Sequence, residues 1–148
     1  MKKVDKSESL TRYIFNDNYF SVKKNIVKKG AFQPKFNQEK KRWETSVFRT
    51  SDLSPDKILR LGEEGVEPYR TDHRKMLGYA NIVAGIVFDN SLIIDPDDKP
   101  LRHANILNWI EDFEKLNAIE KIKAIEKIKV IAVKLAFAAS LHLKVPDR

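Results

Sequence analysis

The clearest pattern of apolar and polar residues lies near the middle of the chain. Residues 43–50 read Trp-Glu-Thr-Ser-Val-Phe-Arg-Thr and are rich in aromatic and β-branched types. Charged residues precede this segment, and Ser-Asp follows it. Such a run, bounded by polar residues, favours a β-strand. We therefore predict that residues 43–50 form the central strand of a sheet.

A helix is predicted directly after this strand. Ser54 is a favourable N-cap because its hydroxyl can accept a hydrogen bond from a free backbone N–H group. Pro55 fits the first helical position, where no N–H is needed. The helix is expected to end at Gly62 or Gly65, since glycine commonly follows a helix C-terminus.

The segment after this helix is harder to assign. Residues 66–75 are polar and predict a loop. Residues 77–88 are apolar enough for a strand or a short helix, and we expect either one to lead into a second strand at 92–94. Residues 95–100, Asp-Pro-Asp-Asp-Lys-Pro, predict another loop.

The last third of the chain has a helical pattern. Asn108, followed three residues later by Glu111, resembles a capping box. The hexapeptide Ala-Ile-Glu-Lys-Ile-Lys occurs twice in tandem at 118–129, and the residues after it are apolar on nearly every face. An unbroken helix over 109–143 would be about 52 Å long, whereas a compact chain of this size has a radius of gyration of about 15 Å. The helix therefore either bends near Asn117 or projects and is covered by another protein chain.

These elements predict a single α+β domain over residues 1–148, with a small few-stranded sheet, a short helix and one long C-terminal helix. The length is sufficient for one hydrophobic core. Within the domain we expect a flexible N-terminal segment at 1–11, a basic aromatic-rich region at 12–50, an α/β core at 51–107 and the C-terminal helix at 108–144.

Composition excludes several classes of protein. The chain has no cysteine, so disulfides, thiol catalysis and cysteine-bound zinc are absent. The longest apolar stretch, 130–143, is interrupted by Lys134 and is too short to span a bilayer. The opening Met-Lys-Lys is followed by polar residues and not by an apolar signal region. We therefore expect a cytoplasmic protein with no membrane contact.

The positive charge is concentrated at one end of the sequence. Residues 1–50 carry 13 Lys and Arg against 5 Asp and Glu, whereas residues 51–148 carry 15 against 16. A local excess of this kind indicates a surface for an anionic partner, and nucleic acid is the commonest. An acidic protein partner and plain solubility are the alternatives.

Aromatic residues are interleaved with the lysines of this basic region, and eight of the chain's 14 aromatics lie in the first 50 residues. Lysine neutralises phosphate and aromatic rings stack on bases, which suits single-stranded nucleic acid. Most of these rings are also needed to build the core. The candidate nucleic-acid-binding residues are Lys23, Lys24, Lys28, Lys29, Lys35, Lys40, Lys41 and Arg42.

Candidate catalytic residues are few. The sequence lacks the glycine-rich phosphate loops, the zinc motif HExxH and the G-x-S-x-G elbow. His103 lies between Arg102 and a predicted buried segment, and it is either a held reactive group or part of the hinge into the C-terminal helix. Arg49 ends the predicted central strand, where pockets commonly form, and His73 is surrounded by charge in a polar loop. Convergence of these four residues would create a cationic pocket able to bind a phosphodiester and exchange protons with it.

Two functions are therefore predicted. The leading one is a nucleic-acid-associated binding or accessory subunit, with the basic region on the phosphate backbone and the C-terminal helix on a protein partner or on a second copy of the chain. The alternative is a small metal-independent phosphodiester-processing or transfer enzyme that uses His103, His73, Arg102 and Arg49. Asp95, Asp97 and Asp98 are interpreted as a solvated turn, so no metal and no cofactor are expected.

Overall fold

The computed structural model describes residues 2–145 of the chain. Met1 and residues 146–148 belong to the predicted domain but lie outside the described residues. Twelve helices and strands follow one another: β1 Ser9–Ile14, β2 Phe20–Ser21, β3 Ile26–Val27, β4 Lys35–Asn37, β5 Arg42–Arg49, α1 Pro55–Gly65, β6 Gly78–Val83, α2 Ala84–Asp89, β7 Ile93–Pro96, β8 His103–Leu107, α3 Ala118–Ala138 and β9 Ser140–Leu143.

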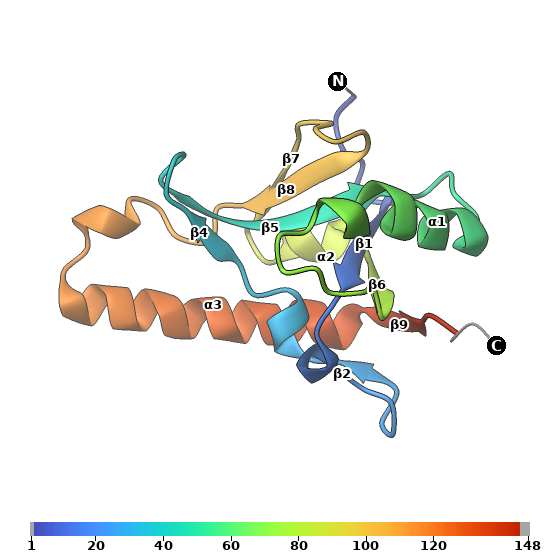
Figure 1. Cartoon of the computed structure of the whole chain (residues 1–148). Coiled ribbons are helices and arrows are strands. Elements are labelled where there is room, and N and C mark those ends of the chain that lie inside the picture. Colours follow the sequence, from blue (N-terminus) through green and yellow to red (C-terminus); the bar gives the residue numbers. More distant parts are fainter. Residues whose placement is uncertain (1, 146–148) are drawn as a thin grey trace.

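A seven-stranded sheet forms the centre of the molecule (Figure 1). Its strands are ordered β7-β8-β5-β1-β6-β9, and β4 pairs with one end of β5. Each of these pairings is antiparallel. The predicted α+β class is confirmed, and the central strand predicted at 43–50 is β5, which ends one residue earlier at Arg49. The hairpin of β2 and β3 is separate from this sheet.

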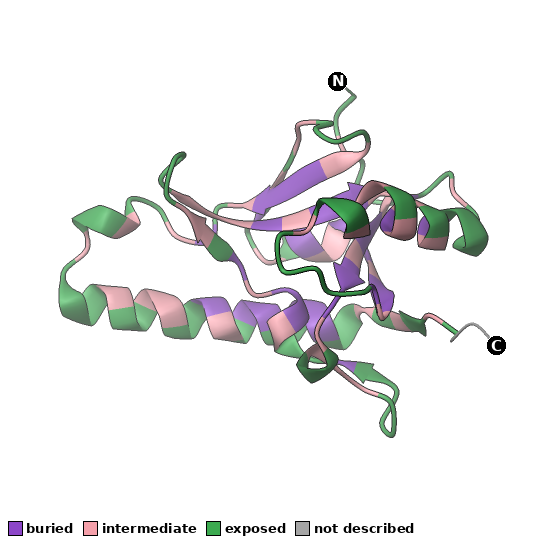
Figure 2. Cartoon of the chain, in the orientation of Figure 1, coloured by how far each residue is buried: buried purple, intermediate pink, exposed green. Residues whose placement is uncertain are grey.

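Each face of the sheet carries its own hydrophobic core, because alternate residues of a strand point to opposite faces. On β5, Val47 belongs to the larger core, which also contains Leu135 of α3. The next residue, Phe48, belongs to a smaller core with Ile58 of α1. The sheet is therefore covered by α3 on one side and by α1 on the other (Figure 2).

The start of α1 is confirmed at the predicted residues. The hydroxyl oxygen of Ser54 accepts a hydrogen bond from the backbone N–H of Lys57 at 3.4 Å, and Pro55 occupies the first turn. The helix ends at Gly65, one of the two predicted positions.

The start of the C-terminal helix differs from the prediction. The capping box is formed by Asn117 and Glu120, with hydrogen bonds of 2.9 and 3.0 Å, and not by Asn108. Asn108 has a left-handed backbone with φ of 73°, and its side chain donates a hydrogen bond to the carbonyl oxygen of Ser91. His103, which was one candidate for a hinge into this helix, lies instead in strand β8 at His103–Leu107. The helix α3 therefore has 21 residues and needs no bend.

The end of this helix is also earlier than predicted. Residues 140–143 leave the helix and pair with the free edge of β6 as strand β9. Gly78 on β6 allows this close pairing, since a Cβ atom there would lie 2.4 Å from the carbonyl oxygen of His142. The pairing gives the backbone N–H and C=O groups at the edge of β6 hydrogen-bond partners. The apolar pattern of residues 140–143 does not show that this edge is available.

The prediction of a flexible segment at 1–11 is wrong for its last residues. Ser9–Ile14 is strand β1, which lies between β5 and β6. Thr11 is fully buried because its hydroxyl forms hydrogen bonds with Thr50 at 2.7 Å and with Asn81 at 2.6 Å. The segment looks polar in the sequence, but its polar groups find partners far along the chain.

Residues 77–88 contain both of the predicted alternatives. The first part is strand β6 and the second part is the short helix α2. The helix leads into β7 at Ile93–Pro96, close to the second strand predicted at 92–94.

Candidate functional site

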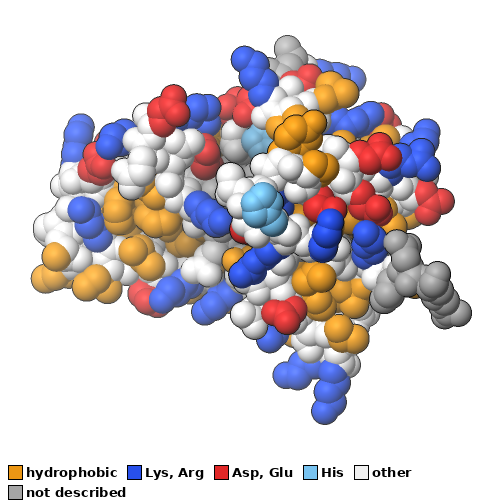
Figure 3. All heavy atoms as spheres, in the orientation of Figure 1, with side chains coloured by type: hydrophobic (Ala, Val, Ile, Leu, Met, Phe, Trp, Pro, Cys, Tyr) orange, Lys and Arg blue, Asp and Glu red, His pale blue; other side chains and the backbone are white. Residues whose placement is uncertain are grey.

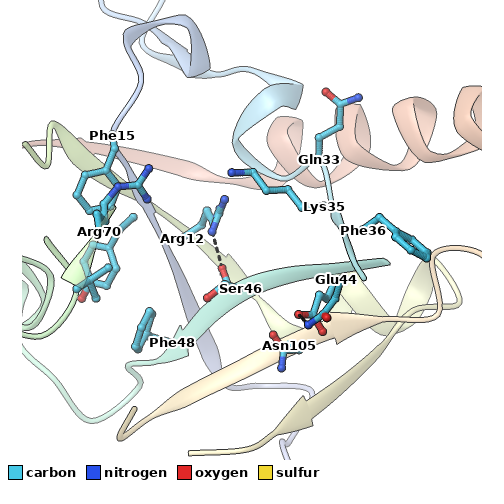
Figure 4. A pocket seen from close by; sticks show the side chains of 13 residues that line it. Arg12, Phe15, Gln33, Lys35, Phe36, Glu44, Ser46, Phe48, Arg70 and Asn105 are labelled. Carbon is cyan, nitrogen blue, oxygen red and sulfur yellow. Dashed lines mark hydrogen bonds between the residues drawn. The ribbon is translucent and has the colours of Figure 1, made fainter. Parts of the chain in front are cut away.

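The candidate site opens where two neighbouring strands separate. β1 and β5 are paired only at Leu10 with Arg49 and at Thr11 with Phe48, and β4 pairs with β5 beyond that point. A cavity of about 360 Å³ lies between these elements (Figure 4). We call it the basic cleft, after the polar and charged residues in its wall. They are Arg12, Gln33, Lys35, Asn37, Glu44, Ser46, Arg70 and Asn105.

Arg12 of β1 is the central cation of the basic cleft. Its guanidinium donates hydrogen bonds to two backbone carbonyl oxygens, that of Ala31 at 2.8 Å and that of Ser46 at 3.0 Å. Among residues 2–145 no carboxylate lies within ion-pairing distance of it. Burial lowers the pKa of Arg12 to about 10, so the group remains charged at neutral pH. A partly buried cation without an anionic partner costs free energy, and a bound anion would offset that cost.

Two further cations line the same cleft. Lys35 of β4 is exposed and makes no ion pair within the described part of the chain. Arg70 lies 4.0 Å above the ring of Phe15 and forms a bidentate pair with Asp72, with bonds of 3.0 and 2.6 Å. The hydrogen bond from Arg70 contributes most to lowering the pKa of Asp72 to about 2. Arg12, Lys35 and Arg70 also line a smaller hollow of about 230 Å³ beside the cleft.

The acidic residue of the cleft is already engaged. Glu44 of β5 accepts a hydrogen bond from Nε of Arg42 at 2.9 Å and one from the side-chain amide of Asn37 at 2.8 Å. These contacts hold its carboxylate at the end of the cleft next to β4. The cleft therefore keeps a positive balance from Arg12 and Lys35.

The eight basic residues predicted from the sequence lie in three places. Lys23 and Lys24 are in the turn of the β2–β3 hairpin, which projects at the bottom of Figure 3, and Lys28 and Lys29 follow that hairpin. Lys35 lies in the basic cleft. The remaining three residues are in or beside the β4–β5 turn: Lys40, Lys41 and Arg42.

Only two of these eight residues form ion pairs with described residues. Lys41 pairs with Glu114 at 3.4 Å, and Arg42 pairs with Glu44. Most of the predicted basic region is therefore not neutralised by the protein's own described carboxylates.

Two of the predicted catalytic residues come together, but in a different hollow. Arg49 and Arg102 both line a hollow of about 540 Å³ at the opposite end of β5. Arg49 forms a bidentate pair with Glu8, at 2.9 and 2.8 Å, and Arg102 forms one with Asp52, at 2.6 and 3.0 Å. Both guanidinium groups are therefore occupied by carboxylates of the same chain.

The two predicted histidines are separated as well. His73 lies in an exposed loop with φ of 57° and lines neither the basic cleft nor the Arg49–Arg102 hollow. His103 of β8 is largely buried, and its ring lies between Ser46 and Asp97. The predicted pocket of two arginines and two histidines is thus divided among three places.

Sequence reasoning missed Arg12 and Ser46 and gave Asp97 no chemical role. Arg12 is a single charged residue among the otherwise uncharged residues of β1. A charge at that place in a strand is the one sequence feature that could have pointed to Arg12 as a functional residue. Ser46 is a small polar residue in the strongest strand, where nothing local reveals which groups of the neighbouring strand face it.

Comparison with known proteins identifies no matching family model, no matching curated protein and no matching solved structure. No helix among residues 2–145 combines the length and the apolar character needed to cross a bilayer. The same residues contain no cluster of three or more metal-ligating side chains. The basic cleft and the residues beside it are therefore the basis for a functional proposal.

Proposed function

We propose that the protein binds nucleic acid and that the basic cleft holds the phosphate backbone. The observation that carries this proposal is Arg12, a partly buried cation whose side-chain hydrogen bonds to the described residues go only to carbonyl oxygens. A phosphate oxygen can accept the guanidinium hydrogen bonds that these carbonyls leave free. Lys35 supplies a second charge in the same cavity.

The surroundings of the cleft favour a polymer over a small isolated anion. Lys23 and Lys24 of the β2–β3 hairpin and Lys40 of the β4–β5 turn make no ion pair among the described residues and add positive charge at two places outside the cavity. Phe36 lies in the cleft wall, where an aromatic ring is suited to stack on an unpaired base. A chain of several phosphates would contact more than one of these groups at once, and each contact adds to the affinity.

The proposal also gives α3 the role of contacting a protein partner. The helix exposes large apolar side chains along its outer side, and Phe137 is 91% exposed. The others are Ile119, Ile122, Val130 and Val133. If α3 is such a surface, Phe137→Asp abolishes association of the chain with itself or with a co-purifying protein in size-exclusion chromatography. If the Phe137→Asp variant associates as the parent does, α3 is not the partner surface.

Nucleic-acid binding is tested by fluorescence anisotropy with a labelled single-stranded oligonucleotide at several salt concentrations. Contact with roughly five or six phosphates of a single strand gives a slope of about −3.5 to −4.2 for log K against log salt. Reversal of Lys23, Lys24, Lys28 and Lys29 to glutamate abolishes binding. A flat salt response contradicts the proposal.

A matched pair of single substitutions tests the cleft itself. Lys35→Glu reverses a charge inside the basic cleft, whereas Lys127→Glu reverses an exposed charge on α3 outside it. Both variants change the net charge equally, so a general electrostatic effect affects them alike. We expect Lys35→Glu to weaken binding about tenfold or more and Lys127→Glu to weaken it less than about twofold. If both variants lose the same affinity for the oligonucleotide, binding depends on the overall charge of the protein and not on the basic cleft.

A further inference from the structure

Three side chains beside the basic cleft form a hydrogen-bonded chain. Asp97 Oδ1 lies 2.7 Å from His103 Nδ1, and His103 Nε2 lies 2.6 Å from Ser46 Oγ. The members come from separate elements, since Ser46 is on β5, His103 is on β8, and Asp97 directly follows β7. The His103 ring also packs edge-on against Phe48 at 5.4 Å.

The partners of Asp97 determine the direction of these hydrogen bonds. Its second oxygen accepts a hydrogen bond from the side-chain amide of Asn105 at 3.1 Å, and its first accepts one from the backbone N–H of Lys99 at 3.1 Å. Burial raises the pKa of Asp97, but the hydrogen bonds from His103 and from the backbone of Lys99, together with nearby positive charge, outweigh it, so the net shift is downward. An ionised carboxylate only accepts hydrogen bonds, so Nδ1 of His103 carries the proton. In the neutral imidazole, Nε2 is then an acceptor facing the hydroxyl of Ser46.

Ser46 lies at the boundary between two cavities of different character. On one side is the basic cleft, with Arg12 and Lys35. On the other side is a hollow of about 410 Å³, mostly apolar, whose wall includes Val66 and Tyr69. A ligand that fits both has an anionic group next to a flat apolar group, as a nucleotide does.

We propose that Ser46 is a nucleophile that cleaves a phosphodiester of the bound nucleic acid, with His103 as its base and Asp97 as the residue that positions His103. The inference rests on the proposed function, because it places the scissile phosphate in the basic cleft. An oriented base within hydrogen-bond distance is the arrangement that activates a serine hydroxyl.

The reaction has two steps whose atoms balance without an oxidant or a reductant. In the first, Ser46 Oγ forms a bond to phosphorus, its proton moves to His103 Nε2, and the bond from phosphorus to the leaving oxygen breaks on the opposite side. In the second, water gives a proton to that leaving oxygen and its own oxygen bonds to phosphorus. The bond from Ser46 to phosphorus breaks, and His103 returns the proton to Oγ.

Arg12 is placed to stabilise the charge that develops during both steps. Its Nη1 already donates to the carbonyl oxygen of Ser46, so the guanidinium is next to the residue that attacks. A guanidinium has five N–H groups, and that of Arg12 forms two hydrogen bonds with the part of the chain that the structure describes. The others are available to the non-bridging phosphate oxygens.

The nucleophile is tested with diisopropyl fluorophosphate, which needs no knowledge of the natural substrate. Attack by Ser46 forms an Oγ–P bond and releases fluoride, and mass spectrometry locates the adduct. We expect labelling of Ser46 in the full chain and a loss of about 100-fold or more in labelling rate for His103→Ala. No adduct on Ser46, or the same rate in His103→Ala, overturns the proposal.

The chain contains its own matched control. Ser140 Oγ lies 3.1 Å from His142 Nε2, so a second serine–histidine pair is present on β9. No carboxylate holds that histidine within the described residues. If Asp97 activates Ser46 by orienting His103, the reagent leaves Ser140 unlabelled. The Ser140→Ala substitution then leaves the labelling of Ser46 unchanged. Equal labelling of both serines overturns this role.

Turnover separates the catalytic inference from nucleic-acid binding. The parent and Ser46→Ala are incubated with a labelled oligonucleotide and with bis(4-nitrophenyl) phosphate, and binding is measured in parallel. We expect Ser46→Ala to bind the oligonucleotide as the parent does but to cleave neither compound, and Asp97→Asn to lower kcat with little change in KM. A parent that binds but cleaves nothing overturns the inference and leaves the proposed function intact. Cleavage of the small diester without oligonucleotide binding supports Ser46 and contradicts the nucleic-acid assignment.

Discussion

The Arg49–Arg102 hollow and the basic cleft differ in how the chain neutralises Arg49 and Arg102 on the one hand and Arg12 on the other. At one end of β5, Arg49 and Arg102 each form two hydrogen bonds with a carboxylate of the same chain. In the basic cleft, Arg12 forms hydrogen bonds with carbonyl oxygens and with no carboxylate of residues 2–145. An anion approaching Arg49 must displace Glu8, whereas an anion approaching Arg12 displaces no described carboxylate. The comparison shows that the partners of a cation, more than its position in the sequence, decide whether it is free to bind a ligand.

The largest effect is expected from removing Arg49. Its guanidinium joins β5 to Glu8 and to the backbone carbonyl oxygens of Lys2 and Lys3. Arg49→Ala leaves the partly buried carboxylate of Glu8 without its cation, and we expect the free energy of unfolding to fall by about 2 kcal/mol. Urea denaturation measures this loss. Oligonucleotide affinity of the folded variant stays within about twofold of the parent; a larger decrease would make this hollow part of the binding surface.

Arg12→Gln is expected to show the opposite pattern. Glutamine keeps an amide group with two N–H donors but removes the charge, so we expect oligonucleotide affinity to fall about tenfold, or about 1.4 kcal/mol. The free energy of unfolding changes by less than about 1 kcal/mol, because two effects oppose each other. Loss of the hydrogen bonds destabilises the fold, whereas removal of a partly buried charge without an anionic partner stabilises it. Anisotropy and urea denaturation of the same preparation measure both quantities. A large loss of stability with unchanged affinity would make Arg12 a structural residue.

The identity of the interaction partners also explains how much of the fold the sequence predicts. Helix α1 was predictable because Ser54 and Pro55 act within a few residues of each other, and β5 was predictable from its own composition. Strands β1 and β9 were missed because their stability comes from distant partners, such as Thr50 for Thr11. Local chemistry specifies local elements, whereas polar segments buried by long-range hydrogen bonds carry no local signal.

The candidate site follows the same rule. The excess of lysine in the first third is visible in the composition, and Lys35 was among the predicted residues. The contact between Ser46 and His103, 57 positions apart, depends on the register between β5 and β8, which pairs Phe48 with His103 and so places Ser46 diagonally opposite the histidine. Strand register of this kind is set by the whole sheet, so no motif in the sequence could have revealed it.

Acid titration provides a smaller test of the paired arginines. The hydrogen bond from Arg49 lowers the pKa of Glu8 below its ordinary value of 4.5. Because the folded value is below the unfolded one, ionised Glu8 stabilises the fold above pH 4.5, and this stabilisation is lost as the pH falls through the folded value. We expect the parent to lose more free energy of unfolding than Glu8→Gln between about pH 5 and pH 3, measured by urea denaturation. Equal losses would mean that the pair contributes nothing to the pH dependence.

The smallest effect is expected at Asp52, and it tests the comparison most directly. The side chain of Asp52 is 68% exposed, so its pair with Arg102 is screened by water, and Asp52→Ala costs about 0.5 kcal/mol or less. The substitution also frees the Arg102 guanidinium, which still donates to the carbonyl oxygen of Arg49 at 3.3 Å. If the lack of a carboxylate partner is what makes Arg12 available, the freed Arg102 gains weak affinity for inorganic phosphate, which a titration followed by nuclear magnetic resonance detects. A freed Arg102 that still ignores phosphate would show that the shape of the basic cleft, and not the absence of a carboxylate alone, selects the anion.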